Sequence, residues 1–176
     1  SLGFSEVSWL DDPAHSQTGP LAQTQSERWF VQSYQTLWRA RIERGSRRYK
    51  RVALPTPSKS SEINAIGARA NGDVLVSREG ELLSFNRAEG RFQRRFDTHL
   101  LKELGKLSLI TSQGFRPSTA PTDGWWIGTL NGALLSTEGE GQLRRVSLPS
   151  DLKLGKVLSV IELRPQGTSS APLNSE

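Results

Sequence analysis

The chain has 176 residues, of which 35% are hydrophobic and 23% are charged, and its formal net charge is +5. No stretch approaches the roughly 20 apolar residues that a membrane helix needs. The absence of cysteine excludes disulfides, thiol catalysis and Cys-ligated zinc. The chain opens on Ser1 without a signal sequence and contains no Met. We therefore expect it to be processed, or cut from a longer chain.

The first predicted element is a short apolar strand at 5–10, followed by a loop at 11–27 that is rich in Ser, Gln, Thr and Pro. A hairpin with strands at 28–33 and 36–43 comes next, and then a basic strand at 47–54. β-branched and aromatic residues bounded by Gly, Pro, Asn and Ser favour strands. The first part of the chain therefore predicts four strands in the order apolar, hairpin pair, basic.

The same order of strands occurs twice more. Residues 72–84 align without gaps with residues 124–136, and both segments predict two strands around a turn that ends in glycine. Glu79-Gly80 and Asn131-Gly132 suit two-residue hairpin turns, which need positive φ. One or two helical turns are expected at 99–104. The later predicted strands are 62–68, 73–78, 81–86, 91–96, 107–112, 125–129, 133–137, 142–148 and 157–163.

Four short strands in each repeat of about 45–55 residues are typical of a β-propeller blade. The sequence therefore predicts an all-β fold with three four-stranded blades and one extra strand, over residues 1–165. Residues 166–176 have the composition of a flexible tail or linker. Closed propellers have about 4–8 blades, so we expect a partial propeller that is a fragment of a larger one or borrows strands from another copy. The predicted blades are 5–54, 62–96 and 107–148, with the extra strand at 157–163.

The segment Trp125-Trp126-Ile127-Gly128-Thr129, with its turn glycine Gly132, resembles the two-component regulator propeller repeat. The resemblance covers roughly residues 5–164. The second copy lacks the tryptophan and the strand glycine, and the first keeps Trp29 but loses both glycine positions. The resemblance implies a periplasmic or extracytoplasmic sensor region of a bacterial histidine kinase or diguanylate cyclase. It implies no catalysis in this segment, so an enzymatic output domain would lie outside the chain.

In a propeller, ligands usually meet the face formed by the middle hairpin turns and by the links from each outer strand to the next inner strand. The structural repeat positions are Trp29, Trp126, Gly128 and Gly132. The two tryptophans are expected to pack between blades. We expect Trp126 to be buried, and its replacement by alanine to cost about 3–5 kcal/mol. The candidate ligand-binding residues on the ligand face are Tyr34, Lys59, Arg78, Asn131 and Lys153.

The sequence predicts no catalytic residues, no metal site and no cofactor. His15 and His99 fall in predicted loops, without further ligands or carboxylates at the spacing that zinc or general-base chemistry needs. The basic segment 39–51 is the strongest run of positive charge, and phosphate contacts with a base stacked on Tyr49 are one interpretation. Basic strands recur at 91–95 and 144–145, however, so their place in the repeat explains the charge. Nucleic acid is therefore disfavoured, and an acidic glycan or membrane surface stays open as an anionic partner.

The leading functional prediction is a non-enzymatic sensor or ligand-binding propeller segment of a bacterial membrane-associated protein. The first alternative is a scaffold for protein–protein interaction without a sensing role. A weaker alternative is a glycan-processing enzyme on a propeller scaffold. The predicted partners are other blades or another copy of the chain, and a small molecule or glycan. Contact with a membrane is expected only through segments outside the chain. A repeat fold alone does not choose among these functions.

Overall fold

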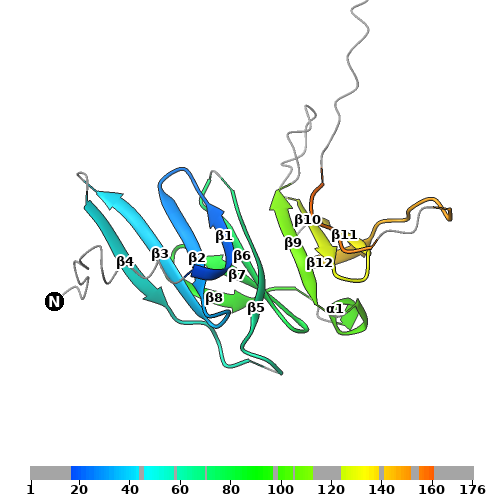
Figure 1. Ribbon diagram of the computed structural model, residues 1–176, viewed down its shortest axis with the longest axis horizontal. Coiled ribbons are helices and arrows are strands. Elements are labelled where there is room, and N and C mark those ends of the chain that lie inside the picture. Colours follow the sequence, from blue (N-terminus) through cyan, green and yellow to red (C-terminus); the bar gives the residue numbers. More distant parts are fainter. Residues whose placement is uncertain are drawn as a thin grey trace, which may run out of the picture.

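The computed structural model describes residues 17–43, 46–57, 59–69, 71–96, 99–104, 106–112, 124–138, 141–151 and 155–160. Their strands form three four-stranded antiparallel sheets, each in simple chain order (Figure 1). The first sheet holds β1 (Gln17–Gln23), β2 (Glu27–Gln32), β3 (Thr36–Glu43) and β4 (Ser46–Val52). The second holds β5 (Ile63–Ala68), β6 (Val74–Arg78), β7 (Glu81–Asn86) and β8 (Arg91–Arg94). Helix α1 (His99–Leu104) precedes the third sheet, which holds β9 (Leu107–Ser112), β10 (Trp125–Thr129), β11 (Leu134–Glu138) and β12 (Gln142–Arg145).

The all-β prediction and the three-fold repeat of four strands are confirmed. The predicted strands 36–43, 81–86, 107–112 and 125–129 and the helical turns at 99–104 match the structure at both ends. The predicted loop at 11–27 is wrong over residues 17–23, because these residues form β1, the first strand of the first sheet. The predicted strand 5–10 lies outside the described residues.

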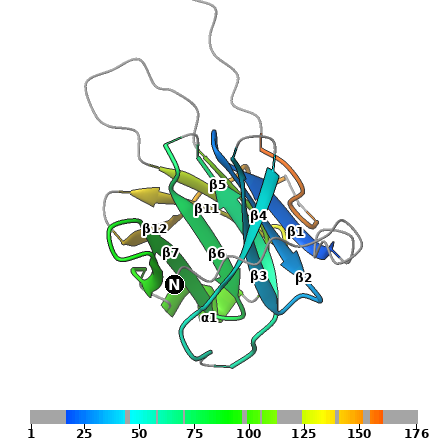
Figure 2. The ribbon, with the colours of Figure 1, turned by 90° about the vertical axis from the view of Figure 1, so that its left-hand side faces the viewer.

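The three sheets pack on one another in chain order through their first strands. Strand β5 lies between β1 and β9, and Figure 1 shows the three sheets following one another in chain order. Figure 2 looks along this row, with β4 of the first sheet in front of β5 and β6. One apolar core joins the first and second sheets, and a second core joins the second and third sheets. The first core includes Trp29, Val31, Val76 and Phe85, and the second includes Leu75, Leu82, Trp125 and Ile127. Side chains that alternate along β6 and β7 therefore serve two different cores.

Two glycines allow neighbouring segments to approach the sheets closely. A Cβ atom on Gly67 in β5 would lie 2.5 Å from Ile110 Cγ2 in β9. A Cβ on Gly128 in β10 would lie 2.6 Å from the Cβ of Val157, which is buried against the far face of the third sheet. The segment around Val157 thus lies against the third sheet as β9 lies against the second. Residues 157–160 of the predicted strand 157–163 form no strand, and residues 161–163 are outside the described part.

The hairpin turns differ in length between the sheets. Arg78 pairs with Glu81, so the predicted two-residue turn at Glu79 and Gly80 is confirmed, with a φ of 70° at Gly80. The predicted two-residue turn at Asn131-Gly132 is wrong, because Thr129 N–H donates to the carbonyl oxygen of Ala133 and leaves a three-residue loop. Gly132 has a φ of 82°, as three-residue loops with a left-handed last residue require.

The repeat position of Trp126 is right, but its predicted burial is wrong. Trp29 and Trp126 each lie four positions before a three-residue loop and face the side of the following sheet. Trp29 is fully buried against the second sheet, whereas Trp126 is only half-buried. No sheet among the described residues covers the third sheet on that side. Trp125, on the opposite side of β10, is buried in the core with the second sheet.

Some arginine side chains contact aromatic rings between the sheets, whereas others are exposed on the outer strands. Arg47 and Arg94 are exposed, as predicted. The guanidinium of Arg39, however, lies 5.4 Å from the ring centre of Trp29 and 5.6 Å from that of Phe85, so it contacts both the first and the second sheet. Arg69 lies 4.2 Å from the ring centre of Trp125 in the third sheet. Such cation–π contacts add to packing where water is partly excluded.

Candidate functional site

The hairpin turns of the three sheets lie at the end of the molecule where the links between sheets enter. The N–H of Ile63, at the start of β5, donates to the carbonyl oxygen of Tyr34 at 2.6 Å. Near the third sheet's turn, Leu130 N–H donates to the Lys106 carbonyl at 3.0 Å. We call this region the turn end, defined by the turn residues 33–35, 79–80 and 130–132 together with Lys59 in the link from β4 to β5. In Figure 1 the link from β4 to β5 runs below the sheets at this end.

Three of the predicted ligand-binding residues are exposed at the turn end. Tyr34 is half exposed and adopts a φ of 58°, and its neighbour Ser33 has a φ of 50°. Left-handed backbone at two residues other than glycine is uncommon, and the tight turn of this hairpin accounts for it. Lys59 and Asn131 are also exposed, whereas Lys153 lies outside the described residues. The exposed candidates belong to different sheets and links, so they mark a broad surface instead of one cluster.

Arg78 does not suit the predicted ligand role, because only 3% of its side chain is exposed. Its guanidinium pairs with the equally buried carboxylate of Glu81 at 2.6 Å and donates to the Pro55 carbonyl oxygen at 2.8 Å. Burial lowers the pKa of Arg78, and the charge and hydrogen bond of Glu81 act in the opposite direction. Arg94 also pairs with Glu81 and donates to the Thr56 carbonyl. These ions hold the link between the first and second sheets.

A pair of similar hollows occurs at the turn end. One, of about 490 Å³, lies between the start of β3 and the segment Arg51-Val52-Ala53-Leu54-Pro55. The other, of about 650 Å³, lies between the start of β11 and Arg145-Val146-Ser147-Leu148-Pro149. The two segments differ in sequence only at Ala53 and Ser147. Arg78 from the following sheet lines the first hollow, and no following sheet is described at the second.

Glu27 is the centre of a second partly buried ion cluster. Its carboxylate, 6% exposed, accepts hydrogen bonds from Arg39 and from Arg41 Nε, the latter at 2.6 Å. Burial raises the pKa of Glu27, but the hydrogen bonds and charges of Arg39 and Arg41 outweigh it and hold the pKa below 4.5. A lowered pKa in the folded state contributes stability above the ordinary pKa, and this is lost as the pH falls through the folded value.

We expect Glu27→Gln to lower the free energy of unfolding by about 2 kcal/mol at pH 7, because charge-assisted hydrogen bonds to Arg39 and Arg41 are lost. The difference from the parent chain should shrink as the pH falls below the ordinary pKa of 4.5 and through the lowered folded value, where Glu27 becomes protonated in the folded state as well. Urea titrations at pH 7 and about pH 3.5 measure it. A pH-independent difference would show that the charge of Glu27 is not the cause.

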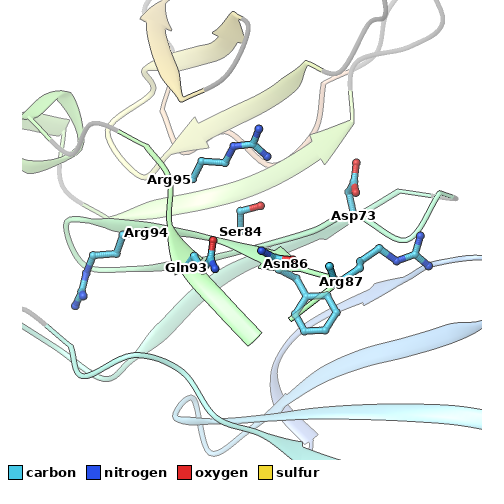
Figure 3. A pocket seen from close by; sticks show the side chains of 9 residues that line it. Asp73, Ser84, Asn86, Arg87, Gln93, Arg94 and Arg95 are labelled. Carbon is cyan, nitrogen blue, oxygen red and sulfur yellow. The ribbon is translucent and has the colours of Figure 1, made fainter. Parts of the chain in front are cut away.

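A polar hollow of about 530 Å³ lies along β7 and β8 of the second sheet, near the end opposite the turns (Figure 3). Ser84, Asn86, Gln93 and Arg95 line it from β7 and from β8 and its exit. None of these residues was predicted as a site. The sequence feature that could have predicted this site is the alternation in Leu82-Leu83-Ser84-Phe85-Asn86. It places Ser84 and Asn86 on one face of the strand and apolar residues on the other.

No family model, curated protein or solved structure matches the chain. Within the described ranges, no helix is long and apolar enough to cross a membrane. The same residues include no group of three or more His, Asp or Glu side chains that could hold a metal ion.

Proposed function

We propose that the chain is a segment of a β-propeller that acts as the non-enzymatic, ligand-binding sensor region of a bacterial membrane-associated signalling protein. The observation that supports this most is the packing of three four-stranded sheets in chain order through β1, β5 and β9. Propeller blades are likewise four-stranded sheets that repeat in chain order, packed around a common centre. The resemblance of 125–134 to the two-component regulator propeller repeat adds the sensor role and an extracytoplasmic location.

The far face of the third sheet supports the proposal that a further blade packs there. Trp126 occupies the repeat position at which Trp29 is buried by the following sheet, yet it is only half-buried. Val157 already packs against Gly128, and its N–H donates to the Thr129 carbonyl oxygen at 3.2 Å. The hollow beside Pro149 repeats the one in which Pro55 receives Arg78. The blade that we propose would come from a longer chain or from another copy.

The turn end is the surface that we propose for the sensed ligand. It exposes Tyr34, Lys59 and Asn131, which offer an aromatic ring, a cation and an amide. A small solute present at 100 times its dissociation constant stabilises the folded state by about 2.7 kcal/mol. For a chain of this size, that corresponds to a rise in Tm of about 5–10 °C.

A thermal-shift screen of small solutes, followed by Tyr34→Ala and Asn131→Ala, tests the proposal. We expect at least one solute to raise Tm, and both variants to reduce the rise while Leu21→Ala, a change at an exposed residue of β1, leaves it intact. A rise that neither turn-end variant changes would place the ligand elsewhere. A screen without any rise would oppose the sensor role.

An interaction scaffold is the second candidate function. Leu130 and Tyr34 are 40% and 50% exposed at the turn end, and large exposed apolar side chains favour contact with another protein. In that case no small solute would raise Tm. Leu130→Asp and Tyr34→Ala would instead weaken the binding of a protein partner.

A further inference from the structure

The polar hollow along β7 and β8 of the second sheet has properties of a binding site that is separate from the turn end. Ser84 in β7 is directly opposite Gln93 in β8, and Asn86 and Arg95 follow on the same face by strand alternation. Figure 3 shows Ser84 and Arg95 extending on the side of the third sheet, whereas Arg94 extends the other way. The volume of about 530 Å³ lies within the range of small-molecule sites, about 300–1,000 Å³.

The opposite face of β7 and β8, which lies against the first sheet, is filled by aromatic side chains. Phe85 and Phe92 alternate with Ser84 and Gln93 and point to that other side. The ring centres of Phe85 and Phe92 lie 5.0 Å and 5.9 Å from that of Trp29, and the Arg39 guanidinium covers the cluster. Ser84, Asn86 and Gln93 are half-buried on the face of β7 and β8 that holds the hollow. The same two strands thus pack a core on one face and line a polar hollow on the other.

The charges around the hollow favour an anion. Arg87 and Arg95 are exposed at its two sides. Asp73 is the acidic residue of the lining, and its carboxylate lies 3.7 Å from Arg69 and accepts a hydrogen bond from the Asn71 amide at 2.8 Å. The nearby Glu89 pairs with Arg91 and accepts a hydrogen bond from Gln93. Both carboxylates are therefore partly neutralised by basic residues.

We propose that this hollow binds a small anion that carries hydroxyl groups beside a carboxylate or phosphate. The Arg95 guanidinium binds the anionic group, because its planar fork of donors matches the oxygens of a carboxylate or phosphate. The Ser84 hydroxyl and the Asn86 and Gln93 amides exchange hydrogen bonds with the hydroxyl groups. This inference rests on residues of the second sheet alone, so it does not depend on the sensor role or on a fourth blade.

Isothermal titration of the whole chain tests the site with three probes of similar size: D-glucuronate, D-glucose 6-phosphate and neutral D-glucose. We expect at least one of the two anions to bind with a dissociation constant of about 1 mM or less, and D-glucose to bind at least tenfold more weakly. Tighter binding of glucuronate identifies a carboxylate as the anchored group, and tighter binding of the phosphate identifies a phosphate. Failure of both anions to bind, or binding of D-glucose with equal affinity, overturns the proposal.

Variants locate the binding. Arg95→Gln should raise the dissociation constant of the bound anion at least tenfold, and Asn86→Ala should raise it about threefold or more, because each removes a direct contact. Arg48→Gln, which removes an exposed arginine of the first sheet, is the matched control and should leave the affinity unchanged. Circular dichroism confirms that each variant is folded. Folded Arg95→Gln and Asn86→Ala variants that bind as tightly as the parent chain would overturn the assignment, as would an equal loss in Arg48→Gln.

Discussion

Replacing Trp29 with alanine is expected to lower the free energy of unfolding by about 3–5 kcal/mol, the largest effect of any single truncation in the first core. Trp29 has no exposed surface and contacts Phe85, Phe92 and the Arg39 guanidinium. Its removal leaves a cavity between two sheets and exposes three partners at once. The rings of the second sheet cannot move to fill this cavity without breaking their own packing.

Trp126→Ala is the matched comparison, because the two tryptophans hold the same position in the repeat. Trp126 is only half-buried, so part of its ring is in water in both the folded and the unfolded state. We expect its replacement to cost less than half as much as that of Trp29, since the free energy of burial follows the apolar area removed from water. Urea titrations of both variants measure the difference. Equal losses would show that the far face of the third sheet is covered in solution.

The second large effect is expected at the buried ions that hold the link between the first and second sheets. Glu81→Ala should cost about 3–5 kcal/mol, because the Arg78 guanidinium would remain buried without its carboxylate. Arg78 and Glu81 side chains are each 3% exposed, so water cannot readily replace the missing partner. Arg94, half exposed, can turn to solvent when Glu81 is removed.

A double variant separates the loss of the pair from the loss of packing. Arg78→Met combined with Glu81→Leu replaces both charges by apolar groups of similar size, and such replacements are often neutral or stabilising. We expect it to recover most of the stability lost in Glu81→Ala, as measured by urea titration. A double variant as unstable as Glu81→Ala would show instead that the hydrogen bond from Arg78 to Pro55 is the main contribution.

The strands of the second and third sheets were predictable because their residues are strongly patterned. Leu107 to Ser112 and Trp125 to Thr129 are rich in β-branched, aromatic and leucine side chains and are bounded by polar or glycine residues. The repeat predicted the remaining strands, since a strand that is clearly patterned in one copy indicates where the corresponding strand lies in another copy.

Strand β1 was missed because its sequence, Gln-Thr-Gly-Pro-Leu-Ala-Gln, has low intrinsic strand preference. Its pairing with β2 and its packing against β5 hold it in the sheet. Pro20 is tolerated because the register shifts between Gln17 and Leu21, where the regular ladder is interrupted. Contacts with residues far away in the sequence cannot be predicted from the local composition of β1.

The candidate site was predicted only in part. Hairpin turns and links identified the turn end, and Tyr34, Lys59 and Asn131 are exposed there. Arg78 was misjudged because its place beside a turn suggested solvent, although it shares a strand face with Val74 and Val76 in the first core. The hollow at Ser84 and Gln93 depends on how β7, β8 and the turns beside them are placed in the folded chain, which strand patterns do not encode.

One cross-linking measurement tests the packing of successive sheets through their first strands most directly. The chain has no cysteine, so Gly67→Cys with Ile110→Cys introduces a single possible intramolecular disulfide. The two Cβ positions lie 3.0 Å apart, so a small outward shift reaches the usual disulfide separation of about 3.5–4.5 Å. After mild oxidation, mass spectrometry should find a monomer without free thiols, whereas Arg48→Cys with Ile110→Cys, which keeps Gly67, should keep both thiols. A folded Gly67→Cys, Ile110→Cys protein that retains both thiols would contradict the contact between β5 and β9.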